Sequence, residues 1–91
     1  MIRSFRHKGL KELFETGQTR RIAPAFHKRL RYRLDLLDHL VTLQGLSLAG
    51  LYPHPLHGTP KRHAISVNGP WRLTFGWDGE HVTDVDFEQY H

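Results

Sequence analysis

The stretch RHAISVNGPWRLTFGWDGEHVTDVDF, residues 62–87, decides the fold. It contains three strand candidates, at residues 62–67, 71–77 and 82–87. The dipeptides Asn68-Gly69 and Asp78-Gly79 join them, and both are typical of tight hairpins, because primed turns need positive φ angles. The stretch therefore predicts a three-stranded antiparallel meander.

The middle strand candidate alternates between two kinds of side chain. Its apolar set is Trp71, Leu73, Phe75 and Trp77, and its other set is Arg72, Thr74 and Gly76. Successive side chains of a strand point to opposite faces of the sheet, so this pattern indicates one buried face and one open face. We therefore expect Arg72 to point away from the helices that cover the sheet.

The residues before this stretch predict a short opening strand at residues 2–5 and two helices. In the first helix Leu10, Leu13 and Phe14 share one face, and Gly17 is a natural C-terminal stop. A longer helix follows Pro24, and its apolar stripe consists of Phe26, Leu30, Leu34, Leu37 and Val41.

The segment Gly45–Pro60 is rich in glycine and proline and has no clean period, so we expect it to be mainly loop. A strand, two helices and then an antiparallel meander make an α+β fold. A chain of 91 residues has room for one modest core, so residues 1–91 are expected to form a single domain.

The composition excludes several classes of protein. The absence of cysteine rules out a disulfide framework and thiolate chemistry, and it fits a reducing compartment. No apolar run is long enough to span a bilayer, and the start of the sequence does not read as a signal peptide. We therefore expect a cytoplasmic protein that makes no membrane contact.

Positive charge is concentrated in the middle of the chain. The formal net charge is +4, and the helix that begins near Pro24 carries Lys28, Arg29, Arg31 and Arg33. Such a basic segment attracts polyphosphates through counterion release. The alternative is an ordinary solvated helix face.

The open face of the sheet is the place where the chemistry is expected. If the long loop crosses the sheet beside Arg72, its side chains and those of neighbouring segments are expected to converge on one concavity. These residues are His54, His57, Lys61, Arg62, Tyr90 and His91. An imidazole transfers protons near neutral pH, and a guanidinium matches two phosphate oxygens as negative charge builds. A Tyr-His pair at positions 90–91 adds little to a core, which also favours a chemical role.

Structural explanations compete with this one. The histidines can be ordinary loop residues, Tyr90 can close the sheet edge, and Arg72 can form a cross-strand ion pair with Asp84 or Asp86. Strict alternation also places His91 on the core side, so it reaches the open face only if the last residues leave the strand.

A metal site is not expected. His54, His57 and His63 supply nitrogen ligands, but their spacing matches none of the familiar zinc motifs. No phosphate-cradling glycine loop, serine nucleophile elbow or dinucleotide fingerprint is present either. We therefore expect neither a metal nor another cofactor.

Short motifs along the whole chain resemble the HigB/GraT branch of the RelE/ParE toxins of bacterial type II toxin-antitoxin modules. They are Met1-Ile2-Arg3-Ser4-Phe5, Lys8-Gly9-Leu10, His54-Pro55-Leu56-x-Gly58, Ser66-Val67-Asn68-x-x-Trp71-Arg72-Leu73-Thr74-Phe75 and Tyr90-His91. The resemblance implies a fold like that of the microbial RNases and a metal-independent endoribonuclease that cuts mRNA, typically in the ribosomal A site. It also implies a helix-turn-helix antitoxin encoded beside the toxin. The toxin is expected to contact operator DNA only through this antitoxin.

The resemblance also assigns site residues. It gives catalytic roles to Arg72, which stabilises developing charge, to His91 and His54, which transfer protons, and to Tyr90, which positions or stacks a nucleotide. His57, Lys61 and Arg62 are expected to hold RNA, and the surface formed by Lys28, Arg29 and Arg31 is expected to contact the antitoxin or ribosomal RNA. Gln89 departs from the pattern, because many relatives have an aspartate there, and His57 stands where some have lysine.

Two other functions remain open at this point. ParE-type relatives share the fold and poison DNA gyrase, but they generally lack the catalytic histidines, so Tyr90-His91 favours the RNase. A catalytically weak module that binds RNA or a protein partner is the second alternative, because Gln89 replaces an acidic residue.

Overall fold

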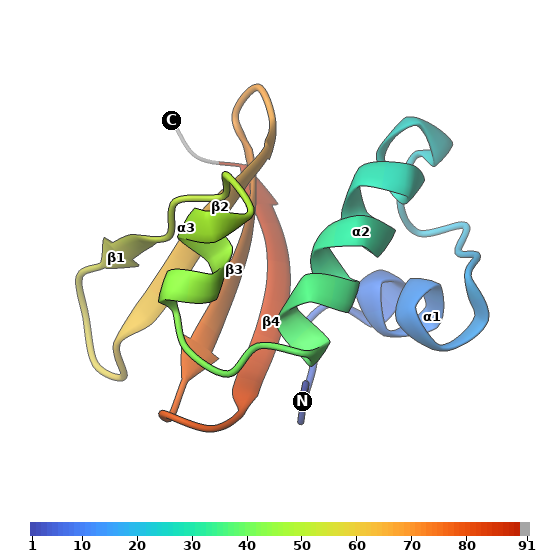
Figure 1. Ribbon diagram of the computed structural model, residues 1–91. Coiled ribbons are helices and arrows are strands. Elements are labelled where there is room, and N and C mark those ends of the chain that lie inside the picture. Colours follow the sequence, from blue (N-terminus) through green and yellow to red (C-terminus); the bar gives the residue numbers. More distant parts are fainter. Residues whose placement is uncertain (90–91) are drawn as a thin grey trace.

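The computed structural model describes residues 1–89 and shows helices followed by an antiparallel sheet (Figure 1). The elements in chain order are α1 (Lys8–Thr16), a 3-10 turn η1 (Pro24–Phe26), α2 (His27–Asp38), α3 (Gln44–Leu48), β1 (His54–Leu56), β2 (Arg62–Asn68), β3 (Trp71–Trp77) and β4 (Val82–Gln89). The predicted α+β class is confirmed.

The sheet has four strands in the order β1-β2-β3-β4, and each neighbouring pair is antiparallel. The three predicted strands are β2, β3 and β4. Gly69 and Gly79 lie between the paired strands with positive φ angles of 56° and 96°, whereas the preceding Asn68 and Asp78 do not have positive φ angles. The meander is thus confirmed, with one strand added.

The strand β1 and most of α3 lie in the segment Gly45–Pro60, which is otherwise loop, as expected. Only three residues form β1, and the central one is Pro55. Proline has no N–H to donate, so it is tolerated on an edge strand, which is the position of β1. So short a strand has no detectable sequence period.

The predicted opening strand at residues 2–5 is wrong. Ile2 and Phe5 make isolated parallel bridges to Val82 and Val85 of β4, with no continuous ladder between them. Asp84 interrupts the ladder. Its φ angle is 50°, and its N–H donates to the hydroxyl oxygen of Ser4 at 2.8 Å instead of to a backbone carbonyl. A side chain therefore replaces one backbone partner of the expected strand.

Both long helices follow the predicted apolar patterns with two exceptions, Phe14 of α1, which is 37% exposed, and Val41. Helix α1 begins at His7, whose Nδ1 accepts from the N–H of Gly9 at 3.0 Å, and it ends at Gly17 with a φ angle of 82°. In α2 the residues Leu30, Leu34 and Leu37 are fully buried. Val41 was expected on the same stripe but is 81% exposed, because α2 ends at Asp38 and Leu40 is buried instead.

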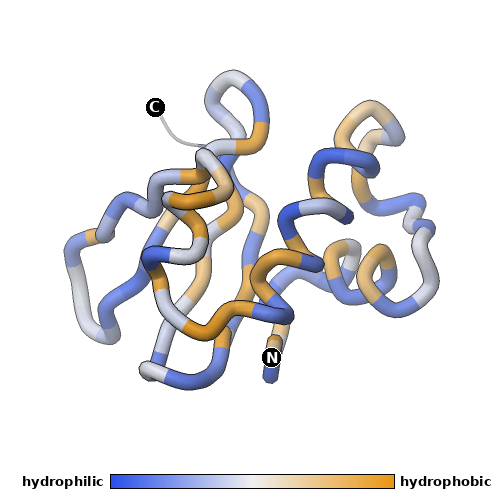
Figure 2. Tube along the Cα trace, in the orientation of Figure 1, coloured by the Kyte–Doolittle hydropathy of each residue, from blue (hydrophilic) through white to orange (hydrophobic). Residues whose placement is uncertain are grey.

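The core lies between the helices and one face of the sheet, and Figure 2 marks the apolar segments of the helices and strands in orange. Leu73 and Phe75 of β3 are fully buried beneath α1 and α2, and Leu46 of α3 joins the same cluster. Trp71 stacks on Phe87 with ring centroids 4.6 Å apart. Since Leu73 and Phe75 face the core, Arg72 lies on the opposite face, as expected.

Within residues 1–89, no helix has the length and apolar character needed to cross a membrane.

The close approach of Gly76 to Thr83 allows a test of the packing between β3 and β4. A Cβ atom at this position would lie 2.5 Å from the Oγ1 atom of Thr83, a stiff β-branched side chain. We expect Gly76→Ala to lower the free energy of unfolding by about 1–3 kcal/mol through overpacking, measured by urea denaturation. Thr83→Ala should restore most of this loss in the double variant, whereas an unchanged stability of Gly76→Ala would contradict the close approach.

Candidate active site

The open face of the sheet carries rows of side chains that the strand register brings together. One row runs His54, Ala64, Thr74, Asp86 across the four strands, and the next runs Ser66, Arg72, Glu88 across three of them. Directly paired residues of antiparallel strands point to the same face. Basic, acidic, hydroxyl and imidazole groups therefore share one surface.

Arg72 is half-buried on this face and is held by the β2–β3 turn. Its Nη1 donates to the carbonyl oxygens of Gly69 at 2.6 Å and of Trp71 at 3.0 Å, and it lies 3.5 Å from the Ser66 hydroxyl. Within residues 1–89 the guanidinium makes no ion pair, so the alternative of a cross-strand pair with Asp84 or Asp86 is wrong. The guanidinium is therefore held in one orientation, and its positive charge is available to an anion.

A chain of hydrogen bonds crosses the same face from β2 to β4. Nη2 of Arg62 donates to the Thr74 hydroxyl at 3.0 Å and to the carbonyl oxygen of Asp84 at 2.8 Å. The Thr74 hydroxyl in turn donates to Oε2 of Glu88. Thr74 is fully buried, so this polar chain is a fixed part of the sheet.

Arg62 lies among charges of both signs. Partial burial lowers the pKa of this guanidinium, and the nearby Arg6 lowers it further, whereas Glu88, Asp84 and Asp86 act in the opposite direction. The three carboxylates thus compensate part of the cost of burying the cation.

The other predicted RNA contacts lie farther toward the edge of the sheet. His54 is exposed on β1, two strands away from Arg72, and His57 and Lys61 are exposed in the β1–β2 connection. No hydrogen bond joins these three residues to Arg72 in the part of the chain described. Tyr90 and His91 lie outside the described residues.

The three histidines weighed as metal ligands do not converge. His54 pairs with Ala64 and shares its face, whereas the neighbouring His63 points to the other face and packs on Phe75, with ring centroids 5.7 Å apart. Burial, followed by the charge of Lys61, lowers the pKa of His63. Among residues 1–89, no three metal-ligating side chains form a cluster.

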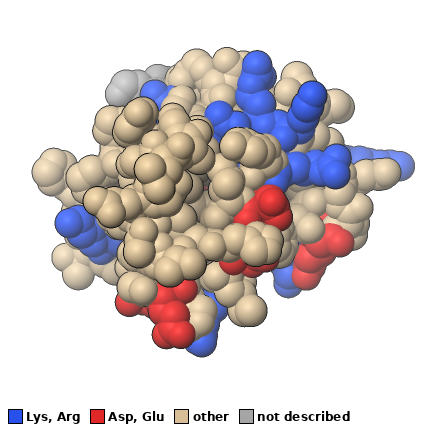
Figure 3. Space-filling view, in the orientation of Figure 1, with Lys and Arg blue, Asp and Glu red and all other residues tan. Residues whose placement is uncertain are grey.

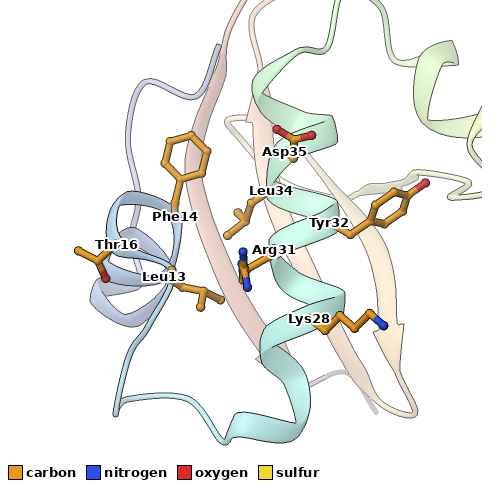
Figure 4. A pocket seen from close by; sticks show the side chains of 9 residues that line it. Leu13, Phe14, Thr16, Lys28, Arg31, Tyr32, Leu34 and Asp35 are labelled. Atoms are coloured by element: carbon orange, nitrogen blue, oxygen red, sulfur yellow. The ribbon is translucent and has the colours of Figure 1, made fainter.

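The surface formed by Lys28, Arg29 and Arg31 lies on α2, away from the sheet. Figure 3 shows Lys and Arg side chains gathered over this part of the molecule. A hollow of about 660 Å³ is lined by residues of both α1 and α2, and in Figure 4 Arg31 and Leu34 point from α2 toward Leu13 of α1. None of the three cations makes an ion pair within residues 1–89, so the surface is suited to an anionic partner.

Two residues of the open face were missed by sequence reasoning. Thr74 was placed on this face but given no role, and Glu88 was not singled out at all. The alternation of β3 and β4 was the available signal, since it puts Arg72, Thr74 and Glu88 on one side.

Comparisons with known proteins agree with the motifs. A family model described as "RelE-like toxin of type II toxin-antitoxin system HigB" matches residues 3–91. The chain is 35% identical over 92 residues to a protein from Proteus vulgaris named "Endoribonuclease HigB", and the match covers 100% of both chains. The chain therefore belongs to the HigB-like family of RelE-like toxins of type II toxin-antitoxin systems.

Proposed function

We propose that this toxin is an mRNA endoribonuclease that inhibits translation at the ribosome and needs no metal ion. The observation that carries the proposal is the guanidinium of Arg72, held on the open sheet face by turn carbonyls and not neutralised by a carboxylate of residues 1–89. The name of the Proteus vulgaris relative supports the same activity. The toxin would act in the cytoplasm, where mRNA and ribosomes meet.

In the proposed reaction the ribose 2′-OH attacks the adjacent phosphate, and Arg72 stabilises the negative charge that builds on its oxygens. His91 serves as the principal acid-base group with His54 as its partner, and Tyr90 positions or stacks a nucleotide. The exposed position of His54 on the same face as Arg72 supports this assignment.

Flanking phosphates are assigned to His57, Lys61 and Arg62. The exposed loop that carries His57 and Lys61 gives their side chains access to an extended RNA strand. Nη2 of Arg62 is occupied by the sheet, so this residue would contact a phosphate through its other nitrogens.

A gyrase poison and a catalytically weak binding module are the alternatives. Expression of the toxin without its antitoxin separates the three functions. An endoribonuclease stops translation first, a gyrase poison stops replication first, and a binding module leaves mRNA intact.

The proposed partners are a helix-turn-helix antitoxin, mRNA and ribosomal RNA, and operator DNA is reached only through the antitoxin. The surface formed by Lys28, Arg29 and Arg31 is the proposed antitoxin contact, because an acidic partner would be steered to it.

Substitution of Arg72 tests the carrying observation. We expect Arg72→Ala to abolish RNA cleavage with little change in melting temperature, because the side chain lies outside the core. Arg72→Lys should recover only part of the rate, since a point charge replaces a planar fork. Full cleavage by the Lys variant, measured on a short RNA, would contradict bidentate recognition of phosphate.

The identity of the nucleophile gives a second test. An RNA with a single 2′-deoxy sugar at the cut site should resist cleavage, and the unmodified RNA should yield a 2′,3′-cyclic phosphate. Cleavage of a short RNA should also persist in EDTA, because side chains provide the charge stabilisation. Mass spectrometry of the products checks both points, and cleavage at the deoxy position would rule out the mechanism.

Charge reversal tests the antitoxin surface. Lys28→Glu with Arg31→Glu should slow association with the antitoxin, more strongly at low salt, and leave cleavage of a short RNA unchanged. Lys8→Glu with Lys11→Glu on α1 is the matched control, with the same change in net charge. If the first variant binds antitoxin normally but loses ribosome binding, the surface contacts ribosomal RNA instead.

A further inference from the structure

The open face carries the carboxylate of Glu88, which has no role in the reaction proposed above. Glu88 stands directly opposite Arg72 in the β3–β4 register, and the two residues make no ion pair within the described chain. Paired residues of antiparallel strands have Cβ atoms about 4.5–5.5 Å apart. A phosphate held by Arg72 would therefore lie next to a carboxylate.

A carboxylate on an anion-binding face is unfavourable for binding, because it repels the phosphate. Loss of such a charge would tighten RNA binding, so Glu88 is kept beside Arg72 either for the charge balance of Arg62 or for a step after binding. Proton abstraction is a step in which a carboxylate is useful.

Hydrogen bonds fix Glu88 in a suitable orientation. Its Oε2 accepts from the buried Thr74 hydroxyl, which itself accepts from Arg62 at 3.0 Å. Within residues 1–89 no hydrogen bond reaches the second oxygen, Oε1. Among the described residues, that oxygen therefore has no donor that would compete with a substrate hydroxyl.

The other two carboxylates of the open face are engaged differently. Asp84 accepts from the Ser4 hydroxyl at 3.2 Å, and Asp86 accepts from the backbone N–H of Phe87 at 2.9 Å. Asp86 stands opposite Thr74 and not opposite Arg72. Glu88 is thus distinguished from both by its position and by its partner.

We propose that Glu88 is the general base that removes the 2′-OH proton, an inference that rests on the proposed endoribonuclease function. The 2′ oxygen forms a bond to phosphorus while its proton passes to Oε1 of Glu88. The bond from phosphorus to the 5′ oxygen breaks, and this oxygen takes a proton from an imidazolium. The products are a 2′,3′-cyclic phosphate and a 5′-OH, and the histidines are needed only as the acid.

Glu88→Gln is the direct test, because its amide oxygen still accepts from Thr74 but cannot take a proton. With a short RNA, we expect kcat to fall by about 100-fold or more and KM to stay equal or decrease. The melting temperature should be unchanged.

Asp86→Asn is the matched control, since it removes one negative charge from the same strand and the same face. This variant should keep a near wild-type kcat. Glu88→Asp retains a carboxylate and should therefore be more active than Glu88→Gln, and this comparison still holds if both Glu88 variants are less stable than wild type. A near wild-type kcat for Glu88→Gln, an equal loss in Asp86→Asn, or equal activities of the two Glu88 variants would each overturn the inference.

Arg72→Ala in the same assay separates this inference from the proposed function. If wild type cleaves, Arg72→Ala does not and Glu88→Gln does, the endoribonuclease function holds and only the role of Glu88 is rejected. If wild type itself leaves RNA intact, the proposed function fails.

Discussion

The structure depends on the two-residue alternation of β3. Leu73 and Phe75 are fully buried against α1 and α2, and between them Arg72 and Thr74 point to the other side. A slip of one residue in this strand would put the guanidinium into the core and the phenyl ring into water. The free energy of core packing therefore also sets which side chains reach the open face.

Much of this arrangement follows from the sequence alone. The turns at Gly69 and Gly79 and the alternation of β3 predict three of the four strands, and leucine periodicity predicts α1 and α2. Val41 was misplaced because periodicity does not show where a helix stops, and the structure ends α2 at Asp38. The strand β1 was missed because three residues centred on Pro55 carry no periodic signal.

The site was less predictable than the fold. Alternation puts Arg72 on the open face, but the Arg62-Thr74-Glu88 chain depends on the register of three strands. A bulge shifts that register between Thr74 and Gly76, and Asp84 adopts a positive φ angle there, which is uncommon for a residue with a side chain. No local pattern in the sequence marks this position. The roles of Tyr90 and His91 remain proposals.

The attachment of residues 2–5 to β4 affects how the protein is made. Ser4 bonds Asp84, a residue 80 positions later, so the segment of residues 2–5 finds its partner only after β4 has been made. Contacts between such distant residues form late, because closing a long loop is entropically costly. A chain in which β4 has not yet paired lacks the carboxylate side of the open face. Arg72 and Glu88 become neighbours only when β3 and β4 pair, so the polar face of the sheet is completed in the same late step that fixes residues 2–5.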